Sequence, residues 1–164
     1  MCTTCYKFDE QLKIGKEYED ILDSYYSEWY NITPVSSDMQ KIGIDRIFRE
    51  VARSGFQYSV EYKSDFWGQK TGNAFVEIIS IDSSKTPGWA FTMCAQILVY
   101  YIPELGKAYR MYATDLKHAV RVWAKNPLYK QKPSHNKGYD TIGICVPLLE
   151  FKKHCFGVDK IKNT

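Results

Sequence analysis

Two stretches of the chain decide the fold, Met39-Gln-Lys-Ile-Gly-Ile-Asp-Arg-Ile-Phe48 and Phe56-Gln-Tyr-Ser-Val-Glu-Tyr-Lys63. In both, apolar and polar residues alternate, which is the period of a β-strand. The Ser54-Gly55 pair between them is typical of a turn. We therefore predict that residues 39–48 and 56–63 form an antiparallel hairpin.

The register of this hairpin brings two acidic residues together. Paired residues in a hairpin lie at equal distances from its turn, and the midpoint between Asp45 and Glu61 is Arg53, beside the turn signal. Side chains two residues apart share one face of a strand, so Glu61 and Lys63 point the same way. Asp45 interrupts an apolar strand, and an unpaired buried charge costs several kcal/mol. We expect a partner that compensates this charge.

The flanking sequence predicts one α/β (α+β) domain over residues 1–164, with a central mixed sheet flanked by helices. A helix is expected from Asp9 to about Tyr30, and a third strand at Ala74–Ile81 would complete a meander with the first two. The remaining expected elements are a short segment at Trp89–Ala95, strands at Ile97–Ile102 and Lys107–Ala113, a helix at Thr114–Lys125, a strand at Ile142–Val146 and a short C-terminal helix. Residues 1–8 are expected to be a flexible N-terminus.

Composition excludes several classes of protein. The 164 residues include 45% hydrophobic and 25% charged residues, which is typical of a folded globular domain, and the formal net charge of +3 does not by itself indicate a nucleic-acid partner. No basic start with an apolar run and no membrane-length apolar stretch occurs, so a cytoplasmic protein without a membrane partner is expected. The five cysteines are expected to stay reduced, and Cys2-x-x-Cys5 lacks the second ligand pair of a zinc site.

The chemistry-bearing motif is Glu61-Tyr-Lys63. An acid-x-Lys tripeptide occurs three times, and the other two, Asp115-Leu-Lys117 and Glu150-Phe-Lys152, fall in predicted helices. Two carboxylates converging beside a lysine provide oxygen ligands that suit Mg²⁺, with water and a substrate phosphate completing its coordination. Lys63 would then orient the attacking water or stabilise the anionic transition state. The alternative is an internal ion pair between Asp45 and Lys63 that only holds the hairpin together, with no metal.

In these residues the chain resembles the PD-(D/E)XK nuclease superfamily, whose core has the order αβββαβ (restriction-endonuclease-like). The resemblance implies Mg²⁺ or Mn²⁺ bound by Asp45, Glu61 and the Tyr62 backbone carbonyl, with Lys63 as a further catalytic residue. Gly15-Lys-Glu-Tyr-Glu19 resembles the G-x-x-x-E helix of Holliday-junction-resolvase-like members, which implies that Glu19 assists metal binding, with Glu17 and Asp20 as competitors. Gly72-Asn-Ala-Phe-Val-Glu77 is similar to small phage-type members. The chain departs from the family name at Ile44, where proline is expected.

The function implied is a metal-dependent deoxyribonuclease that hydrolyses DNA phosphodiester bonds by attack of activated water. A homodimer is expected if both strands are cut. Two alternatives stay open, a catalytically silent nucleic-acid or protein binding module and an RNA-directed nuclease. Glu77 is either a further carboxylate of the site or a solvent-facing residue, and Gln96 is expected to approach the site from the second helix.

A second candidate surface is the segment 126–140, which is predicted to be an exposed basic loop. Its Lys130, Lys132 and Lys137 are expected to contact nucleic-acid phosphates, because lysines bind the backbone without reading sequence. The alternative is a solvated loop with no partner.

Overall fold

The hairpin that carries Asp45 and Glu61 lies inside the larger of two sheets. In the computed structural model, which describes residues 8–52 and 55–162, β2 (Arg46–Glu50) pairs antiparallel with β3 (Gln57–Ser64). Arg46 lies opposite Val60, so extending the register places Asp45 opposite Glu61. The predicted register is confirmed. Of the predicted turn Ser54-Gly55, Ser54 lies outside the described residues, and Gly55 lies in a turn with a φ of +108°.

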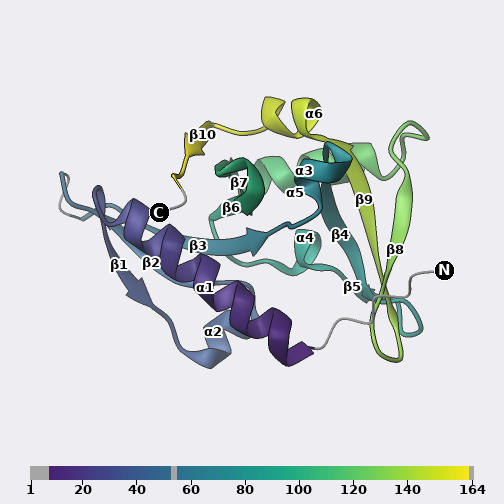
Figure 1. Ribbon diagram of the computed structural model, residues 1–164, viewed down its shortest axis with the longest axis horizontal. Helices are drawn as coiled ribbons and strands as arrows, with labels where there is room; N and C mark the ends of the chain where they lie inside the picture. The colour runs from purple at the N-terminus through teal and green to yellow at the C-terminus, as the bar shows by residue number, and fades with distance from the viewer. Residues whose placement is uncertain (1–7, 53–54, 163–164) are drawn as a thin grey trace.

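The described residues form six α-helices and ten strands (Figure 1). The helices are α1 (Phe8–Tyr26), α2 (Ser37–Lys41), α3 (Gly68–Thr71), α4 (Trp89–Thr92), α5 (Ala113–Trp123) and α6 (Leu148–Lys153). The other strands are β1 (Tyr30–Pro34), β4 (Asn73–Ile81), β5 (Thr86–Pro87), β6 (Ile97–Ile102), β7 (Lys107–Tyr112), β8 (Gln131–His135), β9 (Asp140–Pro147) and β10 (Gly157–Lys160).

The larger sheet is mixed and has the order β1-β2-β3-β6-β7-β10. Strands β1, β2 and β3 form an antiparallel meander, and β6 then pairs parallel with β3. The smaller sheet is antiparallel and has the order β5-β4-β9-β8. The predicted α/β class with a central mixed sheet flanked by helices is therefore confirmed.

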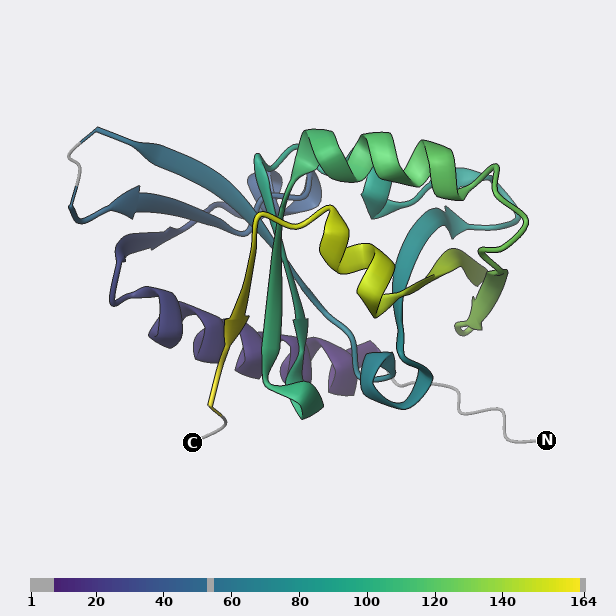
Figure 2. The same cartoon turned by 90° about the horizontal axis from the view of Figure 1, so that it is seen from above.

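Helix α1 covers one face of the larger sheet (Figures 1 and 2). Its Leu22 and Tyr26 recur at helical spacing and are 0% and 2% exposed, packed against Phe48, Val60 and Tyr62 of the meander. Because side chains alternate along β3, Glu61 and Lys63 point to the opposite face. On that face α4, α5, α6 and the smaller sheet form the second core.

The strand at 74–81 was predicted to be the third member of the meander, and this was wrong. After β3, Asp65 accepts hydrogen bonds from the N–H groups of Trp67 and Gly68 (2.8 and 3.0 Å) and so stabilises the start of α3. Gly72 then ends α3 with a left-handed φ of +66°. These turns carry β4 away from β3 and into the smaller sheet.

The first strand of the meander is instead β1. Its first residue, Tyr30, was predicted to end the first helix. Helix α1 ends at Tyr26, and Tyr30 pairs with Glu50 of β2. The N-terminal part of the predicted strand 39–48 was also wrong, since α2 begins after Ser36, whose side chain accepts a hydrogen bond from the Met39 N–H. Gly43 then turns the chain into β2 with a φ of +75°.

The segment 126–140 is only partly a loop. Residues Gln131–His135 form β8, an edge strand of the smaller sheet, with Pro133 opposite Ile142. Proline is accepted at a sheet edge because its missing N–H removes no ladder hydrogen bond there. Strand β10 was also not predicted, and the expectation for residues 1–8 falls almost entirely on residues outside the description.

Two further features bear on the class of protein. None of the described helices combines the length and apolar character that crossing a bilayer requires. Cys94, Cys145 and Cys155 are free thiols; Cys2 and Cys5 lie outside the described residues.

Candidate active site

Glu61 is a buried carboxyl group at the junction of the two sheets. Its side chain is 4% exposed, its Oε1 accepts a hydrogen bond from Lys63 Nζ, and its Oε2 is buried without a hydrogen-bond partner among the described residues. Burial raises the pKa of Glu61 to about 7, and the negative charge of Asp45 adds to this rise, while the Lys63 ammonium opposes it. An unsatisfied buried carboxylate oxygen is costly to the fold unless a ligand or proton compensates it.

Asp45 lies at the start of β2, directly beside Glu61. Its N–H donates to the Val60 carbonyl (2.8 Å), and its Oδ2 accepts the N–H of Tyr62 (2.8 Å), so the carboxylate is held against β3. Gly43 makes this placement possible, because a Cβ at that position would lie 2.9 Å from the Met93 backbone.

Lys63 of β3 points from Glu61 toward Trp89 of α4. Its side chain is 31% exposed and its ammonium lies 6.0 Å from the centroid of the Trp89 ring. Glu77 of β4 approaches the same region, because its Oε1 accepts the N–H of Trp89 (3.1 Å). Burial raises the pKa of Glu77, while the Trp89 hydrogen bond and the charge of Lys63 lower it. Glu77 is therefore a half-buried carboxyl group near Lys63 and does not face solvent freely.

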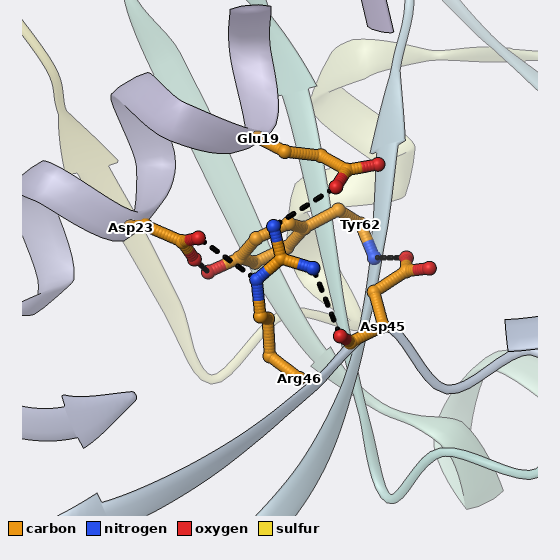
Figure 3. A network of polar contacts seen from close by, with 5 residues as sticks. All are labelled: Glu19, Asp23, Asp45, Arg46 and Tyr62. Atoms are coloured by element: carbon orange, nitrogen blue, oxygen red, sulfur yellow. Dashed lines mark hydrogen bonds and ion pairs between the residues drawn. The ribbon is translucent and has the colours of Figure 1, made fainter. Parts of the chain in front are cut away.

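Glu19 takes part in a different network, on the α1 side of the sheet (Figure 3). Its Oε2 accepts a hydrogen bond from Arg46 Nη2 (2.9 Å), and Arg46 Nε also binds Asp23 (2.8 Å). Asp23 in turn accepts the hydroxyl of Tyr62 (2.9 Å). Burial and the charge of Asp45 raise the pKa of Glu19, and Arg46 opposes this. Of the three acids considered on this helix, Glu17 and Asp20 are exposed and Glu19 is half-buried.

Asp45 connects the Glu61–Lys63 pair on one face of the sheet with the Arg46–Glu19 network on the other. It touches β3 next to Glu61, and its neighbour Arg46 donates to the Asp45 carbonyl through Nη1 (2.9 Å) while holding Glu19. Asp45, Glu61 and Lys63 are thus brought together. Glu19 is linked to them only through its hydrogen bond with Arg46 and through the electrostatic effect of Asp45.

Several residues of the site escaped sequence reasoning. Arg46 and Asp23 were not predicted. Arg46 is only 6% exposed, and a buried arginine requires acidic partners, but its burial became known only from the structure. Gln96 does not reach the acids: its Oε1 accepts the N–H of Ser59 (3.0 Å).

The donor set for a metal is small. Over residues 8–52 and 55–162, no group of three or more His, Cys, Asp and Glu side chains is arranged to hold a metal ion. Asp45 and Glu61 are the two carboxylates side by side, and Tyr62, whose backbone carbonyl was predicted as a ligand, lies between Glu61 and Lys63 on β3 opposite Val99. The Glu61 Oε2, which is buried without a hydrogen-bond partner among the described residues, could serve as an oxygen ligand of a cation. Two carboxylates with water and phosphate oxygens are a donor set that Mg²⁺ accepts.

The three lysines predicted to contact phosphates lie on or beside the β8–β9 hairpin and are exposed. Lys132 pairs with Gly143, which pairs with Glu77, so the three residues form one row across the smaller sheet. Strands are spaced by about 4.8 Å, which puts Lys132 about 10 Å from Glu77 along this row. Lys132 therefore lies in the sheet that carries Glu77, while Lys130 directly precedes β8 and Lys137 lies between β8 and β9.

No family model, curated protein or solved structure matches this chain.

Proposed function

We propose that this chain is a divalent-metal-dependent deoxyribonuclease of the PD-(D/E)XK type, which hydrolyses phosphodiester bonds by attack of activated water. The observation that carries the proposal is the pair of adjacent carboxyl groups of Asp45 and Glu61, which can share a hydrogen bond only when one of them holds a proton. The Glu61 Oε2 is buried without an N–H or hydroxyl donor among the described residues, and Lys63 binds the other oxygen. A hairpin-stabilising ion pair would need only one carboxylate and a cation. It would not need a second carboxylate that raises the pKa of the first.

Asp45 and Glu61 would hold Mg²⁺ or Mn²⁺ together with the Tyr62 carbonyl. When bound, the cation would supply the positive charge that activates water and neutralises the phosphoryl group. The Tyr62 N–H holds the Asp45 carboxylate against β3, beside Glu61. Lys63 uses one of its three N–H donors on Glu61, and the others remain for the attacking water or a phosphate oxygen.

The order of elements supports the same proposal. The chain runs through α1, β1, α2, β2, β3, α3, β4, β5, α4 and β6. Without α2 and the segment α3-β4-β5, this is the αβββαβ order implied by the resemblance, with β6 parallel to β3. Asp45 starts the second strand of the meander, and Glu61 and Lys63 lie on the third.

DNA is the proposed substrate, with the exposed lysines of the β8–β9 hairpin as backbone contacts. They supply charge on the sheet that carries Glu77. A homodimer is proposed for cleavage of both strands, since a two-fold axis presents two copies of the site to antiparallel targets. Sedimentation with and without DNA tests this assembly.

The test is cleavage of linear, nicked, branched and single-stranded DNA, and of a matched RNA, with Mg²⁺, Mn²⁺ or chelator. We expect metal-dependent DNA cleavage that Asp45→Asn and Glu61→Gln abolish, with folding and DNA binding retained. Glu150→Gln and Asp115→Asn are matched controls, because these acids begin the two acid-x-Lys tripeptides that lie on helices α6 and α5.

The controls should cleave at the parental rate. Cleavage that persists in chelator, or in either Asp45→Asn or Glu61→Gln, would refute the metal site. Preferential cleavage of RNA would assign the site to the alternative substrate, and DNA binding without any cleavage would assign the chain to the binding-module alternative.

A further inference from the structure

A cavity of about 210 Å³ lies on the α1 face of the larger sheet, at the C-terminal end of that helix. Six of its eleven lining residues are aromatic: Tyr26, Tyr30, Phe48, Tyr58, Tyr112 and Phe156. It is smaller than the roughly 300–1,000 Å³ of pockets for drug-sized ligands, so its volume suits a single ring system.

This cavity is separate from the site proposed for hydrolysis. Tyr58 and Val60 line it, whereas Glu61 and Lys63 alternate to the other face of β3. An inference about its ligand therefore does not rest on the proposed nuclease activity.

Two charged residues in the wall restrict the ligand. Glu50 and Arg110 carry opposite charges, but Asp159 neutralises Arg110, so the charge of Glu50 is left uncompensated in the wall. Arg110 is already paired with Asp159 (2.7 Å) and lies over the Phe156 ring at 5.1 Å. A quaternary ammonium ion, which aromatic cages bind, has no N–H to donate to Glu50, so the wall favours a ligand that carries an N–H group.

Glu50 supplies a free acceptor. Its Oε1 accepts the hydroxyl of Tyr58 (2.9 Å), and its Oε2 accepts no hydrogen bond from any described residue. A carboxylate accepts but does not donate, so it selects a ligand with an N–H donor. The hydrogen bond would be charge-assisted and stronger than one between neutral groups.

The outer part of the cavity offers stacking surface. Tyr112 and Phe156 stack on one another with 4.5 Å between ring centroids, and they are 46% and 43% exposed. Exposed aromatic side chains of this kind are platforms on which nucleobases stack, because every base has a π-face.

We propose that this cavity binds one nucleobase that carries an exocyclic amino group, with the ring stacked among the aromatic side chains and the amino group donating to Glu50. The amino group is the donor that the free carboxylate oxygen requires, and cytosine, adenine and guanine each carry one. Uracil presents a carbonyl oxygen at the position where cytosine has its amino group, and this oxygen would repel the carboxylate. The ring N3–H of uracil could donate only if the base were displaced from the position that cytosine takes.

The test is an NMR titration of the full chain with cytidine and uridine, which differ mainly in the amino and carbonyl groups at this position, in the presence of chelator. We expect saturable shifts at the lining residues, with cytidine bound about tenfold more tightly than uridine, as one hydrogen bond to a charged group predicts. Glu50→Gln should bring the two affinities close together, because an amide both donates and accepts while still accepting from Tyr58.

Two further variants separate stacking from misfolding. Tyr112→Ala should weaken the binding of both nucleosides about tenfold. Tyr139→Ala, which removes an exposed tyrosine outside the cavity, should leave both affinities unchanged. A parallel titration with single-stranded oligo-dC and oligo-dT identifies whether the base is taken free or within a strand. Equal binding of cytidine and uridine by the parent, tighter binding of choline, or no saturable shift at the lining residues would overturn the proposal.

Discussion

Replacing Glu61 with glutamine tests the buried carboxyl group most directly, because it removes the charge and keeps the shape. The pKa of Glu61 is raised to about 7 from an ordinary 4.5, mainly by burial. Ionising this group in the folded protein therefore costs about 3 kcal/mol more than in the unfolded chain.

The sign of the effect follows from the direction of this change. Below pH 4.5 Glu61 is protonated in both states; between 4.5 and about 7 the unfolded chain ionises while the folded protein holds its proton. The folded state of the parent thus loses stability as pH rises through this window and stays lower above it. Glutamine cannot ionise, so the Glu61→Gln variant does not lose stability in this pH window.

We expect Glu61→Gln to exceed the parent by about 3 kcal/mol in free energy of unfolding at pH 8, and by less than about 1 kcal/mol at pH 5, without metal. Urea denaturation of both proteins at the two pH values measures this difference. Added Mg²⁺ should stabilise the parent at pH 8, since it binds the ionised carboxylate, and should not stabilise the variant.

Glu150→Gln is the matched control. Glu150 pairs with Lys153 on the surface of α6, and its pKa is lowered by that hydrogen bond, so its substitution should produce no gain at pH 8. If the difference between Glu61→Gln and the parent failed to widen between pH 5 and pH 8, the reasoning about a buried carboxyl group beside Asp45 would be refuted.

Three further variants test the surroundings of the site. Lys63→Ala should lower the single-turnover cleavage rate far more than DNA affinity, because in the proposed mechanism the ammonium acts on the transition state; equal losses would make it a ground-state phosphate contact. Gly88→Ala should lower stability by about 1–3 kcal/mol in a thermal melt, because its Cβ would lie 2.6 Å from the Glu77 carbonyl oxygen; an unchanged melting temperature would contradict this packing. Lys130→Ala combined with Lys132→Ala should reduce the log-log salt slope of DNA binding by up to about two, and an unchanged slope would return the hairpin to a solvated surface.

Local features of the sequence were sufficient to predict the central hairpin. The alternation in 56–63 and the turn signal at Ser54-Gly55 act over a few residues, and together they defined the register that brings Asp45 beside Glu61. The strands at 97–102 and 107–112 and the helix at 113–123 were predictable for the same reason, because each carries its own period.

Long-range choices were not encoded in any single stretch. Strand β4 has the same β-rich composition whether it completes a meander or enters a second sheet, and the capping of α3 by Asp65 and the turn at Gly72 decide between them. The strand β1 was hidden for a similar reason, since Tyr30 continues the aromatic spacing of α1 and becomes a strand residue only by pairing with Glu50.

The sequence by itself determined the types of chemical group in the candidate site and their order along the chain. Asp45, Glu61 and Lys63 follow from strand alternation and hairpin pairing, which depend on neighbours alone. Only the tertiary structure decided the state of those groups: Glu61 is buried because the smaller sheet and α4 cover its face, and Glu19 is drawn to Arg46 because α1 packs on the other. Desolvation and ion pairing depend on elements distant in the chain, so no local pattern could have predicted them.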